Sequence, residues 1–322
     1  MSFKFYLFLI AAFVLLALVA VSSGGASISL GDIVKFFTFG ELDETKELIL
    51  LQMRLPRLVL GILIGALLAT SGVVVQSVFL NPLADPYIIG IASAATFGAV
   101  IAYLLGLSDV FYGIFAFLAA SGLSLVIFKL AAHTRSISTL LIVGIAVSSF
   151  LGAFTSFAVY LIGEDSFRIT AWMMGYLGGA NWQKIALLLP PLLFCMAYFY
   201  AKRHELNIIL NGDEEAKSLG LNVEKSKKSL LIVSSLIIGF SVAFTGMIGF
   251  VGLIIPHTLR MALHTASNAV LIPASALTGG VFLVFCDVIA KNALSPVEIP
   301  IGVVTSFFGA PFFLYLAFRK HA

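Results

Sequence analysis

The stretch "LPRLVLGILIGALLATSGVVVQSVF", residues 55–79, decides the fold class of this chain. Arg57 is its only charged residue. Crossing ~30 Å of hydrocarbon takes roughly 20 predominantly apolar residues in an α-helix. The stretch therefore predicts a membrane-spanning helix. Gly61 and Gly65 form a GxxxG motif, which would let this helix pack closely against a neighbour.

The rest of the chain has the same character. Of its 322 residues, 60% are hydrophobic and 11% are charged, and the mean hydropathy is +1.08. Soluble globular domains carry about 25% charged residues, so this composition excludes that class. The alternating segments of about ten residues that build a transmembrane β-barrel are absent. We expect an all-α polytopic membrane protein.

Apolar runs separated by Gly, Pro and polar residues predict about ten transmembrane helices. Their ranges are 3–23, 55–79, 87–106, 110–132, 137–162, 185–202, 229–247, 250–264, 270–290 and 300–318. Pro256, His257 and Arg260 interrupt the eighth, so we expect it to be short or partly re-entrant. A further short helix is expected at 167–177. Residues 1–322 should form a single transmembrane domain.

The distribution of basic residues predicts the orientation. The first apolar run is followed by no small-residue cleavage pattern, so we expect it to stay as a helix. With both termini in the cytoplasm, twelve of the 19 Lys and Arg residues lie inside and seven outside. Basic residues are enriched in cytoplasmic loops. We therefore expect both termini, and the loop at about 203–228, to be cytoplasmic.

That loop contains a charged island, "LNGDEEAKSLGLNVEKSKK", residues 210–228. Asn211 or Asp213 can cap the start of a helix, and Gly220 can end it. A helix of about two turns is too short to be stable alone in water, so something should pack on it. An ordinary connecting helix and a docking helix for a soluble partner both fit. The chain has no GxxxxGK[ST] phosphate loop, so it should not bind ATP itself.

Four segments together resemble one family. They are "RLPRLVLGILIGALLATSGVVVQSVFLNPLADPYIIGIASAATFGAV" (54–100), "GDEEAKSLGL" (212–221), "GMIGFVGLIIPHTLRM" (246–261) and "EIPIGVVTSFFGAPFFLYL" (298–316). In this order they are similar to the permease subunits of ATP-binding-cassette importers for iron chelates, haem and cobalamin (type II importers). The resemblance covers nearly the whole chain.

The resemblance implies several partners. A second permease copy or a close relative would enclose a translocation path, with two ATP-binding subunits below and a periplasmic or lipid-anchored substrate-binding protein above. The chain itself would bind no cofactor, because ATP and magnesium belong to the ATPase subunits. The location implied is the inner (cytoplasmic) membrane.

The resemblance also implies roles for individual residues. Coupling to the ATPase would fall on Gly212, Asp213, Glu214, Glu215, Ala216, Leu219 and Gly220. Docking of the binding protein would fall on Arg54, Arg57 and Lys291. A cytoplasmic gate would be formed by Asn81, Leu83, Ile137 and Ser138.

Simpler interpretations stand beside these roles. Arg54, Arg57 and Lys291 could instead reach lipid phosphates, and a lysine cannot form the planar bidentate pair that an arginine forms. The segment "NPLADP", residues 81–86, cannot continue a helix because of its two prolines, so it should at least form a turn.

Four further residues carry a choice between structure and chemistry. Asp287 lies inside the ninth predicted span, where we favour a hydrogen-bonded structural carboxyl over a proton relay. For His257 we favour helix packing over metal or haem ligation, since no second histidine has a ligand spacing on its helix face. Cys195 and Cys286 are expected to be small buried apolar side chains. No catalytic constellation is present, so we expect no enzyme.

The function predicted is that of a homodimeric permease that imports an iron chelate, either a siderophore or haem, by alternating access. A cobalamin importer of the same architecture is the alternative. An ion-coupled secondary transporter would instead need interrupted helices and intramembrane charges in both halves, but Asp287 stands nearly alone.

Overall fold

The computed structural model describes the chain except residues 1, 25–27, 41, 132–136 and 320–322, and the described part is helical without any β-strand. Helices lie at all the predicted ranges: Ser2–Ser22 (α1), Leu55–Val78 (α4), Ile91–Leu104 (α5), Asp109–Ala131 (α6), Ile137–Ile162 (α7), Trp182–Ala201 (α9), Val223–Thr245 (α12), Val251–Leu263 (α13), Asn268–Asn292 (α14) and Ile301–Arg319 (α15). Six helical segments of the described part are long and apolar enough to cross a membrane. The prediction of an all-α polytopic membrane protein is confirmed.

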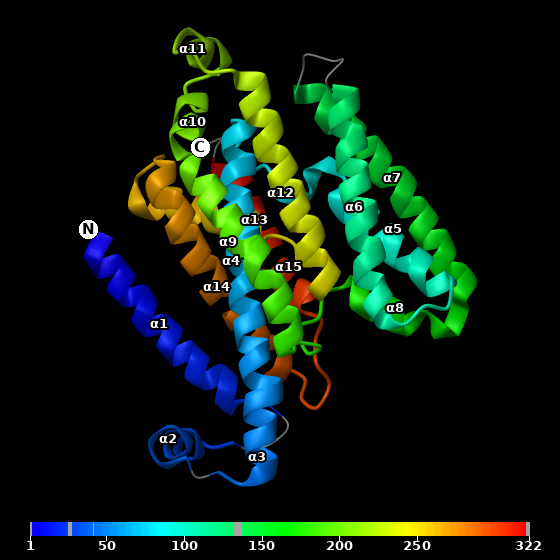
Figure 1. The fold of residues 1–322 in the computed structure, drawn as a ribbon, viewed down its shortest axis with the longest axis vertical. Coiled ribbons are helices and arrows are strands. Elements are labelled where there is room, and N and C mark those ends of the chain that lie inside the picture. Colours follow the sequence, from blue (N-terminus) through cyan, green and yellow to red (C-terminus); the bar gives the residue numbers. More distant parts are fainter. Residues whose placement is uncertain (1, 25–27, 41, 132–136, 320–322) are drawn as a thin grey trace.

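Shorter helices cap the two ends of this bundle. Leu30–Phe39 (α2) and Glu44–Ile49 (α3) lie at one end, which we call the α2 end; Arg203–Ile209 (α10) and Asp213–Ser218 (α11) lie at the other, the α11 end (Figure 1). A π-helix at Leu50–Arg54 joins α3 to α4, so one helical run extends over 35 residues from Glu44 to Val78. The remaining short elements are the 3-10 turns Pro86–Ile89 (η2) and Gly163–Ser166 (η3) and the helix Phe167–Met173 (α8).

Helix α2 is an element that the sequence reasoning missed. It begins with a capping box, in which the Ser29 hydroxyl accepts from the Asp32 amide and the Asp32 carboxylate accepts from the Ser29 amide. The Lys46 ammonium lies 3.0 Å from the same carboxylate. The amide of Ser29 and the Lys46 ammonium lower the pKa of Asp32 to about 2. The S-x-x-D spacing is a recognisable start signal for a helix.

Three predicted helices are shorter than their ranges by two residues or more. Helix α5 begins only at Ile91, because the residues before it form η2 and Gly90, with φ of 83°, separates that turn from the helix. Helix α8 ends at Met173 rather than at residue 177, because Gly175 takes a left-handed backbone with φ of 87° and stops it. Helix α13 has only 13 residues and starts after Phe250, whose φ is 67°. The expectation that the eighth predicted span is short is confirmed.

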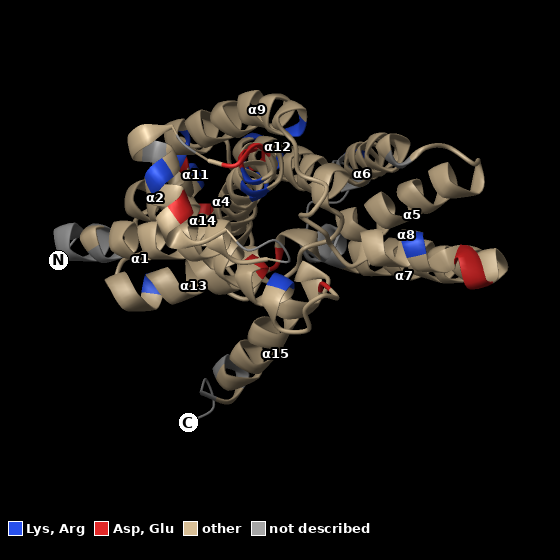
Figure 2. Ribbon diagram, turned by 90° about the horizontal axis from the view of Figure 1, so that it is seen from below, with Lys and Arg blue, Asp and Glu red and all other residues tan. Residues whose placement is uncertain are grey.

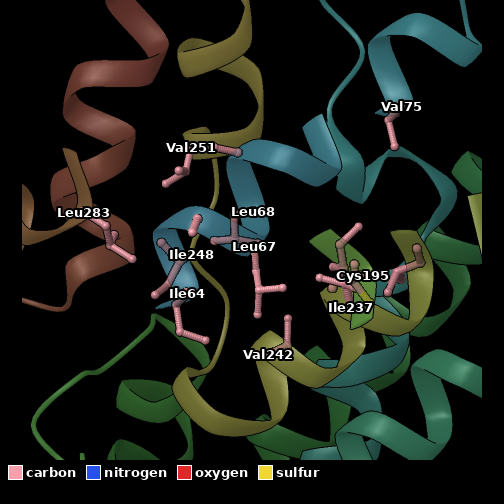
Figure 3. Close-up of a cluster of buried hydrophobic side chains, with 14 of the residues drawn as sticks. Ile64, Leu67, Leu68, Val75, Cys195, Ile237, Val242, Ile248, Val251 and Leu283 are labelled. Atoms are coloured by element: carbon pink, nitrogen blue, oxygen red, sulfur yellow. The ribbon is translucent and has the colours of Figure 1, made fainter. Parts of the chain in front are cut away.

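Helix α4 forms the centre of the core. Its side chains are buried along almost the whole length, from Leu60 to Val78. Figure 3 shows Ile64, Leu67 and Leu68 of α4 gathered with Val242 of α12 and Leu283 of α14. The many small residues of α4 let neighbouring helices approach its backbone closely, which suits a helix at the centre of a membrane bundle.

Glycines bring α4 against its neighbours. A Cβ atom added to Gly65 would lie 2.2 Å from the carbonyl oxygen of Gly279 in α14, and one added to Gly72 would lie 1.9 Å from that of Gly252 in α13. No side chain fits at these distances, so the backbones touch. The prediction that this GxxxG helix packs closely against a neighbour is confirmed.

The helices form two groups with α12 between them. Helices α5, α6, α7 and α8 lie together on one side, and α1, α4, α13 and α14 lie on the other (Figures 1 and 2). Helix α12 contacts both α6 and α4. Figure 2, seen from the α2 end, shows that α15 leans away from the rest and that most of the helical surface carries no Lys, Arg, Asp or Glu.

Candidate functional site

Helix α11 presents an acidic and partly apolar surface at its end of the molecule. Its six residues end at Ser218, and Gly220, two positions later, takes the left-handed φ of 84° that agrees with the predicted stop. Ala216 is buried, whereas Glu214, Glu215 and Leu219 are exposed. The Glu214 side chain is 93% exposed and pairs with Lys217 of the same helix at 3.0 Å. A surface of this kind is available to another molecule.

The start of α11 corrects one expectation. The N-cap is Gly212, with φ of 103°, and no side chain caps the helix. Asn211 therefore does not cap it. Asp213 is the first helical residue, and its carboxylate lies 2.5 Å from the Lys227 ammonium of α12. A side chain held by this ion pair cannot fold back onto the helix start.

A network of amides ties α10, which leads into α11, to the core. The side-chain oxygen of Asn207 in α10 accepts from the backbone and side-chain nitrogens of Asn268 at 2.8 and 3.0 Å. The Ser77 hydroxyl of α4 donates to the Asn268 side-chain oxygen at 3.3 Å. Asn268 is fully buried and opens α14. A displacement of α10 would thus reach α4 and α14 directly.

The predicted turn at residues 81–86 lies at the same end. Leu80 has a φ of 51°, and the Asn81 side chain accepts from the Leu83 amide at 3.0 Å, which turns the chain away from α4. Asn81 and Gly212 both line one pocket of about 390 Å³. The structure thus brings the predicted gate residue Asn81 next to the predicted coupling segment. Ile137 and Ser138 begin α7, but their side chains lie outside the described residues.

An ionic cluster occupies the α2 end; we define it as Arg57, Asp287, Lys291 and Glu298. The Arg57 guanidinium donates from Nε and Nη2 to the Asp287 carboxylate at 2.9–3.1 Å, and from Nη1 to Glu298 at 2.9 Å. The Lys291 ammonium lies 3.4 Å from Asp287. Asp287 is 5% exposed. It is a structural carboxylate held by two cations, in agreement with the structural interpretation.

The other two predicted docking residues bind the end of α1. Lys291 Nζ donates to the Ala20 carbonyl at 2.9 Å, and Arg54 Nη1 donates to the Val21 carbonyl. Cations are favourable at the C-terminal end of a helix, where carbonyls lack helical partners. Arg54, Arg57 and Lys291 therefore lie at the same end of the molecule, and all three side chains are largely buried.

A groove of about 790 Å³ runs between the loop before α13 and helix α15. Its lining is mostly apolar and includes Met174, Met247, Phe250, Gly302 and Phe307. Its polar side chains are those of Asp85, Tyr87 and Ser306.

The remaining residues follow the structural interpretations. The His257 ring packs edge-on against Phe312 of α15, with centroids 6.1 Å apart. Cys195 and Cys286 are buried and not joined in a disulfide. Within the described residues there is no group of three or more His, Cys, Asp and Glu side chains that could hold a metal ion.

Sequence reasoning missed some residues of these sites. Glu298 binds Arg57 although 241 positions separate them. Gln76 of α4 donates to the carbonyls of Gly252 and Leu253 and accepts from Arg260, which pins α4 to α13. A polar amide inside an apolar run is the only local signal that could have drawn attention to Gln76.

The sequence model of the FecCD transport family matches residues 10–319. The chain belongs to the FecCD transport family. It is 43% identical over 85% of its length to the cobalamin import system permease protein BtuC of Halobacterium salinarum, of which 74% is covered. It is 35% identical over 97% of its length to the hemin transport system permease protein HmuU of Yersinia pestis, of which 95% is covered.

Solved structures agree with this membership. A metal-chelate type ABC transporter in an inward-facing conformation superposes with a TM-score of 0.87 at 31% identity, covering 98% of this chain and 99% of that one. PsaBC from Streptococcus pneumoniae, at 17% identity and a TM-score of 0.59, shares the fold. This FecCD-family chain is thus a multi-pass membrane permease of an ATP-binding-cassette importer, a transport subunit rather than a catalytic one.

Proposed function

We propose that this FecCD-family permease forms, with a second copy of itself, the membrane unit of an importer in the cytoplasmic (inner) membrane. The single domain of ten helices would cross the membrane with both termini inside. The bias of basic residues supports this orientation, because it assigns the loop at 203–228 to the cytoplasm. The α11 end then faces the cytoplasm, and the α2 end faces outward.

Helix α11 is the proposed contact for the ATP-binding subunits. The observation that carries this step is the exposure of Glu214, Glu215 and Leu219 on the outer side of this short helix. Ala216 packs inward, and Asp213 is held by Lys227, so the helix is fixed on its inner side. Gly212 and Gly220 bound it on either side and let the chain turn. ATP would be hydrolysed on the partner subunits.

The apolar groove is the proposed wall of the translocation path. The second permease copy would close it, because α15 leaves large apolar side chains exposed beyond the groove, among them Leu314 and Phe318. The turn holding Asn81 and Leu83, together with Ile137 and Ser138 at the start of α7, would form the cytoplasmic gate. The position of Asn81 beside Gly212 supports a link between gate and ATPase contact.

The binding protein would dock on the α2 end, with Arg57 as its main cationic contact. Arg54 and Lys291 are proposed to support that contact by holding the end of α1, since both donate to carbonyls there. An ordinary anchoring of α1 would use the same bonds. Docking assays on Arg54 and Lys291 variants separate the two roles.

The proposed cargo is a metal chelate. An iron chelate, either a siderophore or haem, is the first candidate, and the likeness to the hemin permease along nearly the whole chain supports it. Cobalamin is the second, and the 43% identity to the cobalamin permease supports it. The apolar groove suits both, since neither needs fixed ligands along the path. An ion-coupled mechanism is disfavoured because Asp287 is engaged by Arg57 and Lys291.

Uptake by proteoliposomes tests the proposal. They would contain this permease, its candidate ATPase and a binding protein, and uptake of haem, a ferric siderophore and cobalamin would be measured with and without ATP. We expect ATP-dependent import of one of these chelates. The double variant Glu214→Arg plus Glu215→Arg should lose the ATPase subunits or uncouple hydrolysis from uptake, because it reverses the charge of the exposed face of α11.

A matched pair of acidic residues serves as the control. Glu164 and Asp165 are also adjacent and exposed, but they lie in η3, which directly follows α7 at the α2 end. Their double reversal to Arg should leave ATPase binding intact. Uptake that runs without any ATPase would refute the importer proposal. Normal coupling in the Glu214 and Glu215 variant would refute the role of α11 alone.

A further inference from the structure

The two carboxylates that bind Arg57 are not equivalent. Asp287 takes two nitrogens, Nε and Nη2, and lies on helix α14 with 5% of its side chain exposed. Glu298 takes only Nη1, at 2.9 Å, and is 34% exposed. It lies on the connection from α14 to α15. One carboxylate is thus a fixed inner partner, and the other is an outer partner within reach of solvent.

The connection that carries Glu298 is held in place by other bonds. The Ile299 amide donates to the Ala290 carbonyl at 2.9 Å, and the Ile301 amide donates to the Gly175 carbonyl at 3.1 Å. Just before Glu298, Val297 is exposed. The Glu298 side chain can therefore leave Arg57 without unfolding the connection. It would move into water, where a carboxylate is well solvated.

The same connection leads straight into the groove. The Gly302 amide donates to the Met174 carbonyl at 3.1 Å, and both residues line the groove. The ring of Tyr176, two residues after Met174, lies 6.0 Å from the Arg57 guanidinium. What occupies the outer side of Arg57 is therefore adjacent to one wall of the proposed path.

We propose that Nη1 of Arg57 is a carboxylate-exchange site, occupied by Glu298 in the free permease and by a carboxylate of the binding protein after docking. The inference rests on the proposed docking role of Arg57. Asp287 keeps its two bonds throughout, so the guanidinium stays oriented while its outer partner changes. An incoming carboxylate restores the charge-assisted bond that Glu298 gives up.

Exchange predicts that Glu298 competes with the partner. Removing its charge should therefore tighten docking, whereas a carboxylate that merely shaped the surface would weaken docking when removed. An ion pair that is partly exposed contributes up to about 1 kcal/mol, so the expected gain in affinity is about 2- to 5-fold at low salt. The gain should shrink at high salt, where such pairs are screened.

The test compares Glu298→Gln with the unmodified permease in nanodiscs. The probe is the substrate-binding protein that supports uptake in the reconstituted system, and its Kd is measured at low and high salt. Glu44→Gln is the matched control. Glu44 is an exposed acidic residue of α3 at the same end, and its substitution removes the same charge from the surface. Glu298→Ala repeats the measurement with no side chain left to accept from Arg57.

A second readout follows the connection itself. A spin label at Val297→Cys is selective, because both native cysteines are buried. We expect the label to become more mobile when the binding protein docks on the otherwise unmodified permease. In the Glu298→Gln background it should already be mobile before docking.

The outcomes separate this proposal from the one it rests on. If both Glu298 variants bind the partner as tightly as the unmodified permease or more weakly, exchange at Arg57 is wrong while docking stands. A spin label at position 297 whose mobility does not change on docking would also overturn the exchange proposal. If the unmodified permease does not bind the partner, or Arg57→Gln binds normally, the docking role itself fails.

Discussion

Asp287 shows how one residue can decide the arrangement of several helices. Its carboxylate receives Arg57 from α4 and Lys291 from its own helix, α14. A buried charge is costly unless it is paired and hydrogen-bonded, and here the two cations supply that pairing. Arg57 in turn holds Glu298 before α15. The α2 ends of three helices thus depend on one side chain.

The residue-scale prediction concerns this pair. Asp287→Ala would leave Arg57 and Lys291 buried without their shared partner, and breaking a buried pair costs about 3–5 kcal/mol. We expect a loss of that size in the free energy of unfolding in detergent. Glu298→Gln is the comparison, because its partly exposed pair should change stability by less than about 1 kcal/mol. Equal losses in the two variants would contradict the difference in burial.

At the scale of elements, the contact of α4 with α14 depends on the absence of side chains. The carbonyl of Gly279 occupies the place of a Cβ at Gly65, and the carbonyl of Gly65 does the same at Gly279, where an added Cβ would lie 2.4 Å away. In a membrane, helices associate through close packing rather than through a hydrophobic driving force. The reciprocal glycines therefore fix how near the two helices can come.

Gly65→Ala tests this contact. The new methyl group would lie 2.2 Å from the Gly279 oxygen, so α4 and α14 must separate. Overpacking of this kind costs about 1–3 kcal/mol, which we expect as a loss of unfolding free energy. Gly122→Ala in α6 is the matched control, since no atom lies within 4 Å of an added Cβ there. A Gly65→Ala protein as stable as the control would show that the helices are not in contact.

At the scale of the whole molecule, α14 connects the two ends. Its 25 residues run from Asn268, bonded to Asn207 of α10, to the ionic cluster with Asp287 and Lys291. An α-helix of this length measures ~38 Å. A continuous helix transmits displacement along its axis. The proposed ATPase contact and the proposed docking surface are therefore linked through one continuous helix.

Asn268→Ala should interrupt this connection at the α11 end. It removes the side-chain bonds to Asn207 and Ser77 and keeps the bond from the Asn268 backbone amide to Asn207. We expect hydrolysis to continue while uptake per ATP falls about fivefold, a modest coupling energy. Asn292→Ala is the control at the other end of α14, where the amide bonds only within its own helix. Unchanged uptake per ATP in the Asn268 variant would exclude this route.

Much of the fold was predictable because its signals are local. Long apolar runs predict helices, and Pro and Gly predict where they end, as at the turn after α4 and at Gly220. The resemblance to a permease family came from four such segments and agrees with the comparisons. Helix α2 was missed despite its capping box, because its ten residues are too short to form a membrane span.

The sequence by itself determined that this protein is helical, that it belongs in a membrane and that its charged island contains a short helix. Apolar runs and the backbone preferences of Gly and Pro act over a few residues, so they can be recognised in the sequence directly. Only the tertiary structure decided that Arg57 meets Asp287 and Glu298, and that Asn268 holds α10. Partners separated by 61 to 241 positions meet only once the helices have packed, because no local signal in the sequence links them.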